Sequence, residues 1–136
     1  MVKSTTVYAG QLHCELTHEP SRSRIETDAP KDNQGRGEKF SPTDLVGAAL
    51  ASCILTTMAI VAERNGVSIK GAKAEVEKEM VSTPSRRIGS LRARVNFPAG
   101  VPKDQRAKLE HAARHCPVHK SLHPDVDAPI IFTYPD

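Results

Sequence analysis

The chain has 136 residues, of which 38% are hydrophobic and only 4% aromatic, and it contains no tryptophan. This length suits a single domain over residues 1–136. A core of small aliphatic side chains would be thin, so we expect some apolar surface to be buried against a second copy. The net charge of +3 is spread among interspersed acidic and basic residues, which argues against a dedicated nucleic-acid binder with a clustered basic face.

The cysteines and the N-terminal segment indicate the cellular compartment. Three cysteines is an odd number and does not suggest a disulfide framework. Residues 1–16 lack the apolar run and the small-residue cleavage site of a secretory signal. We therefore expect a cytoplasmic protein, in which a cysteine pair is more often redox-active than structural.

The N-terminal part of the chain predicts two strands and a loop. Tyr8, Cys14 and Leu16 alternate with polar residues, which predicts one strand through residues 8–16 with one polar face. Residues 22–28 predict a second strand that is short and polar. Residues 29–39 collect proline, aspartate, asparagine and glycine, and they predict a loop.

A long apolar helix is predicted after this loop. Ser41 suits the N-cap, Pro42 the first helical position, and Asp44 places a negative charge at the positive end of the helix dipole. Asn65-Gly66 predicts a left-handed C-terminal cap. Because the helix is apolar on nearly every face, we expect it to be the central, fully enclosed element.

The apolar run at residues 45–62 also raises the question of a membrane span, for which about 18 residues are needed. Glycine, serine and threonine interrupt the run, alanine makes it only mildly apolar, and Glu63 and Arg64 follow it at once. This composition favours a buried helix in a soluble protein without a membrane.

The second half of the chain predicts two strands, two helices and a final strand. Apolar and charged residues alternate in both strands, and the apolar stripe of the first helix ends at Cys116. The predicted bounds are residues 69–80 and 88–97 for the strands, 103–115 and 117–122 for the helices, and 130–134 for the final strand. This order of elements predicts the α+β class.

Two cysteines are candidates for chemistry. Cys116 directly precedes Pro117, so its sulfur would receive the free amides of the next helix, and a helix N-terminus favours the thiolate. Cys53 lies inside the apolar helix, where a cysteine is usually a small core residue and burial raises the thiol pKa. Local patterns therefore favour Cys116, and reactivity of Cys53 requires a cation or donors from elsewhere in the fold.

Three other patterns have ordinary structural explanations. Cys14 lies on the apolar face of its strand and is interpreted as a packing residue. Histidines between residues 111 and 123 surround Cys116 and suggest a zinc site, but Pro117 interrupts the helix that would align them. A basic stripe is expected to face acidic residues of the strand at 69–80, because aromatic platforms for nucleic acid are scarce. The stripe consists of Arg86, Arg87, Arg92 and Arg94, and the acidic residues are Glu75, Glu77 and Glu79.

Taken together, these features resemble the OsmC/Ohr family of thiol-dependent hydroperoxide reductases. The resemblance rests on residues 41–53, with the sequence SPTDLVGAALASC, then on Cys116-Pro117-Val118 and a terminal strand. It covers residues 40–136 well and the N-terminal strands loosely. It implies an OsmC-like fold, in which a long buried central helix is wrapped by antiparallel sheets in an intertwined homodimer with two active sites at its interface.

The resemblance also implies roles that reverse the local ranking of the cysteines. Cys53 would attack the peroxide, and Cys116 would resolve the resulting sulfenic acid as a disulfide. The expected partners are a hydroperoxide, organic or hydrogen peroxide, and an external thiol reductant. An apolar pocket would favour organic hydroperoxides. No metal or organic cofactor is expected.

One departure from the family pattern concerns activation of the thiol. Family members commonly carry Asn-Pro-Glu where this chain has Ser-Pro-Thr at residues 41–43, and that glutamate helps orient an arginine over the reactive sulfur. Threonine cannot act as an anion, so Asp44 is the candidate replacement. The candidate arginine is Arg36 in the preceding loop, with Arg22 and Arg24 as alternatives.

Two rival functions remain open from the sequence. One is a non-enzymatic small-molecule-binding or redox-sensing module of the same fold, which a roomy pocket without an arginine–carboxylate pair near Cys53 would favour. The other is a zinc protein that uses Cys116 and neighbouring histidines.

Overall fold

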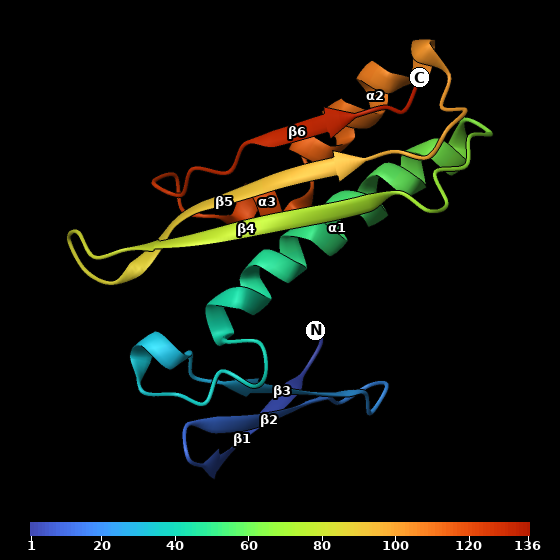
Figure 1. Ribbon diagram of the computed structural model, residues 1–136. Coiled ribbons are helices and arrows are strands. Elements are labelled where there is room, and N and C mark those ends of the chain that lie inside the picture. Colours follow the sequence, from blue (N-terminus) through green and yellow to red (C-terminus); the bar gives the residue numbers. More distant parts are fainter. The chain divides into compact units, whose positions relative to one another are not determined.

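The computed structural model describes residues 1–136, which form two compact units, residues 1–46 and 47–136 (Figure 1). Each unit contains one three-stranded sheet, with the strand order β1-β2-β3 in the first and β4-β5-β6 in the second. The predicted α+β class is confirmed. That both units together make one domain stays a prediction.

The first unit is an antiparallel sheet followed by a loop with one short 3-10 turn. The loop predicted at residues 29–39 contains only this turn, η1. The elements are β1 (Ser4–Gly10), β2 (His13–His18), β3 (Arg24–Asp28) and η1 (Lys31–Asn33).

The prediction of a single strand through residues 8–16 is wrong, because β1 and β2 form a hairpin there. Gln11 and Leu12 have φ values of 55° and 60° and form its tight turn. Such turns favour asparagine and glycine, so the sequence carries no turn signal. Tyr8 lies opposite Cys14 across the hairpin, and the predicted apolar face is therefore preserved.

Helix α1 (Pro42–Arg64) begins where the sequence predicts. The Ser41 side-chain oxygen accepts a hydrogen bond from the Asp44 backbone N–H at 3.0 Å, and the Asp44 carboxylate accepts one from the Ser41 N–H at 2.9 Å. This reciprocal pair satisfies backbone donors that the first helical turn leaves free.

The C-terminal end of α1 also matches the prediction. Gly66 adopts the left-handed conformation with φ at 69°. The N–H of Val67 donates to the carbonyl of Ala62 at 2.9 Å, and the N–H of Gly66 donates to the carbonyl of Glu63 at 3.1 Å. These are the two hydrogen bonds of a Schellman cap.

Within this chain α1 is not fully enclosed, contrary to the prediction. Only 28% of its most apolar 18-residue stretch is buried, and Ile60 is 46% exposed. By length and composition alone the helix could cross a membrane, but core helices of soluble proteins pass the same test. The buried stripe consists of Gly47, Leu50, Ile54, Met58 and Ala62.

The second unit contains the strands and helices that the sequence predicts for the second half of the chain. Strands β4 and β5 are antiparallel, and β6 adds parallel to β5. Helices α1 and α2 lie against one face of this sheet (Figure 1). The elements are β4 (Lys73–Val81), β5 (Arg87–Asn96), α2 (Lys103–Arg114), α3 (Pro117–Ser121) and β6 (Ile130–Thr133).

The two faces of this sheet differ as the alternation predicts. Leu91 and Val95 on β5 are completely buried and contribute to the core under the helices. The exposed Arg94 lies directly opposite Glu75 on β4, and Arg92 opposite another glutamate. Opposite charges at facing positions stabilise a strand pair, so these two arginines have the structural role that was expected, whereas Arg87 lies opposite Val81.

Candidate redox site

Cys53 and Cys116 meet within residues 47–136. Cys53 lies near the middle of α1 and is partly exposed, whereas Cys116 is 0% exposed and forms the N-cap of α3. Both are free thiols, and they lie near enough for Cys53 to affect the protonation of Cys116. The fold therefore brings together the two cysteines that the sequence singled out.

The backbone of α3 holds the sulfur of Cys116. The N–H of His119 donates to Cys116 Sγ at 3.4 Å, and the amide of Val118 also contributes. The ring of His119 is held in turn by the carbonyl of Ala128, 3.0 Å from Nε2. Because a carbonyl only accepts, Nε2 must carry the proton, which fixes the tautomer.

The pKa of the Cys116 thiol is raised above its ordinary value. Burial is the largest cause, and the neighbouring Cys53 acts in the same direction through its polar sulfur and through its negative charge when ionised. The amides of α3 lower the pKa but do not outweigh burial. The sequence correctly predicted the cap, but not that Cys116 would favour the protonated form.

The surroundings of Cys53 include a residue that the sequence argument missed. Thr57 lies one helical turn further on, with its hydroxyl oxygen 3.9 Å from Cys53 Sγ. The spacing of four residues on a helix could have identified this neighbour. By contrast, no local signal pointed to the Ala128 carbonyl, which comes from a loop before β6.

The candidate activating residues belong to the first unit. The pKa of Asp28 is lowered mainly by its hydrogen bond with His13. The positive charge of Arg36 makes a smaller contribution in the same direction. Asp44 uses its Oδ2 atom in the cap of α1. The alternative arginines form ion pairs with other groups: Arg22 with Glu19 at 2.8 Å and Arg24 with Glu15 at 3.3 Å.

The remaining sulfur and histidine candidates lie in ordinary contacts. Cys14 is partly buried on β2, opposite Tyr8 and Thr27. His115 Nδ1 is 2.8 Å from the carbonyl of His111, and their rings stack at 4.1 Å. The group of three side chains with spacing suited to a metal ion lies instead on β2 and β3.

A hollow of about 630 Å³ also occurs in the second unit. It lies along the second half of α1 and the following loop, and its lining includes neither Cys53 nor Cys116. The lining residues are Leu55, Ala59, Glu63, Gly66, Val67, Ser68, Ile69, Lys70 and Ala72.

Comparison with known proteins identifies the family. The family model described as OsmC-like protein matches residues 35–129. The chain belongs to the OsmC-like family. The segment that matches the family model contains Arg36, Asp44, Cys53 and Cys116, and Cys14 lies before this segment.

Solved structures of similar fold cover nearly the whole chain. A candidate osmotic stress induced and detoxification response protein from Psychrobacter arcticus shares 40% identity with a TM-score of 0.92, covering 98% of this chain and 96% of that one. The organic hydroperoxide resistance protein OsmC from Legionella pneumophila shares 16% identity, with a TM-score of 0.79 and the same two coverages. OhrB, an organic hydroperoxide resistance protein of Bacillus subtilis, shares 19%, with a TM-score of 0.70 and 98% of each chain covered. The last two show a common fold. No curated relative matches the chain.

Proposed function

We propose that this protein is a cysteine-based peroxidase that reduces organic hydroperoxides, and hydrogen peroxide as a second substrate, without a metal or organic cofactor. The observation that carries the proposal is the meeting of Cys53 and Cys116 in an OsmC-like fold. A partly exposed thiol beside a buried one is the arrangement that a two-cysteine cycle requires, because only the first must reach the substrate.

The cycle has three balanced steps. The thiolate of Cys53 attacks the distal peroxide oxygen, the O–O bond breaks, and the leaving alkoxide takes a proton to become an alcohol. Cys53 is now a sulfenic acid, and the Cys116 sulfur displaces its hydroxyl to form the disulfide and water. An external dithiol then reduces the disulfide by thiol exchange and is itself oxidised.

The environment of Cys116 supports its role as the resolving cysteine. Its raised pKa keeps it protonated while Cys53 reacts, so it does not compete for peroxide. A protonated Cys116 can also donate its S–H to the Cys53 thiolate. The cap of α3 holds the sulfur near its partner until the sulfenic acid forms.

We further propose that Arg36 supplies positive charge to the Cys53 thiolate and that Asp44 helps to orient it. The position of Arg36 in the loop before α1 supports this assignment, as does the engagement of Arg22 and Arg24 in other ion pairs.

The proposed active form is a cytoplasmic homodimer. The partial burial of α1 supports a second copy, since less than a third of its most apolar stretch is buried in its own chain. Burying one isoleucine side chain contributes about 1.5–3 kcal/mol. We therefore expect Ile60→Lys to weaken dimerisation at least tenfold in analytical ultracentrifugation. An unchanged dimer would remove α1 from the interface.

Titration of the reduced protein with cumene hydroperoxide tests the cycle, with thiols followed by mass spectrometry. The wild type should form an intramolecular Cys53–Cys116 disulfide. Cys116→Ser should stall as a sulfenic acid at Cys53, and Cys53→Ser should leave the peroxide unconsumed. Cys14→Ser is the matched control and should turn over like the wild type. Peroxide consumption by Cys53→Ser at the wild-type rate would refute the assignment.

The hollow of about 630 Å³ away from the cysteines favours one alternative, a redox-sensing or small-molecule-binding module. A sensor would oxidise once and stop, whereas a peroxidase would turn over many equivalents of peroxide per chain in the presence of dithiothreitol. Single-equivalent oxidation in the wild type would select the sensor.

A further inference from the structure

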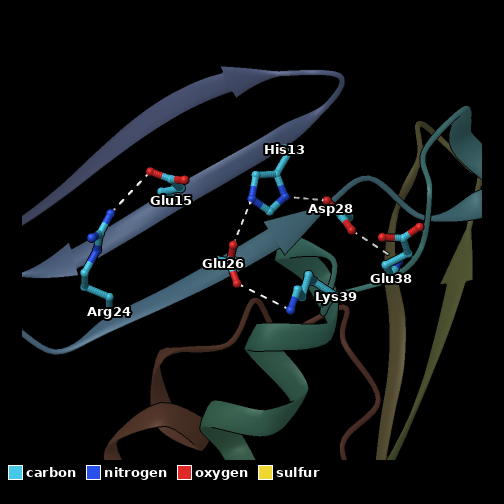
Figure 2. A network of polar contacts seen from close by, with 7 residues as sticks. All are labelled: His13, Glu15, Arg24, Glu26, Asp28, Glu38 and Lys39. Atoms are coloured by element: carbon cyan, nitrogen blue, oxygen red, sulfur yellow. Dashed lines mark hydrogen bonds and ion pairs between the residues drawn. The ribbon is translucent and has the colours of Figure 1, made fainter.

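The polar face of the first sheet gathers four titratable side chains from two neighbouring strands (Figure 2). His13 and Glu15 lie on β2, two residues apart and therefore on one face. On β3, Glu26 lies directly opposite Glu15, and Asp28 directly opposite His13. The proposed peroxidase cycle uses none of these residues.

His13 is held in one orientation by a buried carboxylate. Its Nδ1 atom is 2.6 Å from Asp28 Oδ1, and the Asp28 side chain is only 3% exposed. Asp28 is fixed in turn by the backbone N–H of Glu38, which donates to its Oδ2 at 3.2 Å. Because the carboxylate accepts, Nδ1 carries a proton, and in neutral His13 the lone pair is therefore on Nε2.

The Nε2 atom points at the glutamates. It lies 3.2 Å from Glu26 Oε1 (Figure 2). His13, Glu15 and Glu26 each offer one ligand atom, and these three atoms all lie within 4.8 Å of one another. Tetrahedral zinc, with bonds of about 2.0–2.2 Å, separates its ligand atoms by roughly 3.3–3.6 Å. Small side-chain rotations therefore bring all three atoms to bonding distance.

We propose that His13, Glu15 and Glu26 form a zinc-binding site, in which Asp28 is the positioning residue. A ligating histidine usually donates its second N–H to a carboxylate, which fixes the tautomer and makes the ring a better ligand. The buried Asp28 stands in that relation to His13. Three protein ligands leave a fourth position for water or an anion.

The charges on this face are consistent with a bound cation. Glu15 and Glu26 face each other across the strand pair, and like charges at facing positions repel. Arg24 contacts Glu15 at Oε2, and Lys39 contacts Glu26 at Oε2, so each cation occupies only one oxygen of its glutamate. A zinc ion between the carboxylates would relieve the remaining repulsion.

The site is accessible from solvent. The side chains of His13, Glu15 and Glu26 are 21%, 43% and 45% exposed. A hollow of about 310 Å³ lies beside His13 and also has Arg36 and Lys39 in its lining. When His13 is protonated, zinc displaces that proton to solvent, and nothing is oxidised or reduced.

Zinc titration of the metal-free full-length protein at about pH 8, above the ordinary pKa of imidazole, tests the proposal by calorimetry. One Zn²⁺ per chain should bind, and His13→Ala should weaken binding by more than a hundredfold. Asp28→Asn should weaken it by about 10–100-fold, the usual effect of losing such a partner. His18→Ala, an exposed histidine at the end of the same strand, should bind like the wild type.

Cobalt substitution separates this site from the cysteines. Co²⁺ bound by nitrogen and oxygen shows visible d–d absorption without a thiolate charge-transfer band in the near ultraviolet. Circular dichroism checks that each variant is folded, and if Asp28→Asn unfolds, the exposed Glu15→Gln takes its place, with at least a tenfold loss expected. No stoichiometric Zn²⁺ in the wild type, unchanged binding by His13→Ala, or a thiolate band would each overturn the proposal. None of these outcomes depends on peroxidase activity.

Discussion

Tyr134 connects the C-terminal strand region to α2, and removing its hydroxyl should destabilise the second unit by a calculable amount. The hydroxyl donates to Glu110 Oε2 at 2.8 Å. A hydrogen bond to a charged group contributes about 1.5–3 kcal/mol. The Glu110 side chain is 25% exposed, so water can partly replace the lost donor. We therefore expect Tyr134→Phe to lower the free energy of unfolding by about 1.5 kcal/mol.

The ring itself makes separate contacts that Tyr134→Phe keeps. It stacks on Phe97 with centroids 4.5 Å apart, and the Arg106 guanidinium lies 4.0 Å from its centroid. Aromatic pairs contribute about 0.5–1.5 kcal/mol and cation–π contacts about 0.5–1 kcal/mol. Tyr134→Leu should therefore cost roughly 2 kcal/mol more than Tyr134→Phe.

The same hydroxyl predicts a pH dependence with a definite sign. Burial, and after it the hydrogen bond to Glu110, raises the pKa of Tyr134 above its ordinary value. The folded state therefore holds this proton more tightly than the unfolded chain. The stabilisation is complete below about pH 10, the unfolded pKa, and is lost as the pH rises towards the folded pKa. The difference between wild type and Tyr134→Phe should shrink above that pH.

Urea unfolding at one fixed protein concentration, repeated across alkaline pH, measures both effects. Tyr8→Phe is the matched control, because Tyr8 is 62% exposed and its hydroxyl only accepts from the Leu12 N–H at 3.2 Å. It should change stability by less than about 0.5 kcal/mol. Equal effects of the two substitutions, or a Tyr134→Phe difference that grows above pH 10, would refute the reasoning.

Three further predictions concern α1 and the buried cysteine. Gly47→Ala should stabilise the protein in urea unfolding by about 1 kcal/mol, because the new Cβ would lie 3.4 Å from Val76 and gain helix propensity; destabilisation would mean that another surface approaches this position. Ser41→Ala should cost about 1 kcal/mol in the same assay, since it removes the N-cap acceptor, and no change would assign the cap to other groups. In a Cys53→Ser background, alkylation of Cys116 at pH 9 should be much slower in the folded protein than in urea, because burial raises the pKa of this thiol. The contribution of the protonated thiol to the stability of the fold is complete below about pH 8.5, the unfolded pKa, and is lost as the pH rises through the folded pKa. Equal rates would contradict this.

The helices and the second sheet were predictable because their signals are local. Ser41 and Gly66 cap α1 through hydrogen bonds to residues only a few positions away. The alternation along β4 and β5 reports directly which face is buried. The hairpin at residues 11–12 was missed because its turn has no local signal. Gln11 and Leu12 adopt left-handed conformations that their side chains do not favour.

The candidate redox site was predictable only in part. Cys116 was selected because it directly precedes Pro117 at the start of a predicted helix, and Cys53 was selected by the resemblance to a family. The local sequence around Cys116 could not show whether burial or the helix amides controls the pKa of this thiol. That balance depends on how completely the fold covers the sulfur, and burial is the larger effect.

The amino-acid order by itself determined where α1 begins and ends, which residues of β5 face inward, and that Cys116 caps a helix, because each depends on neighbours within a few positions. Tertiary structure alone decided that Cys53 meets Cys116 and that His13 meets Asp28 and Glu26. These contacts join residues from separate elements, and chain folding sets their distances. Burial, which controls the protonation of Cys116, is likewise a property of the packed fold.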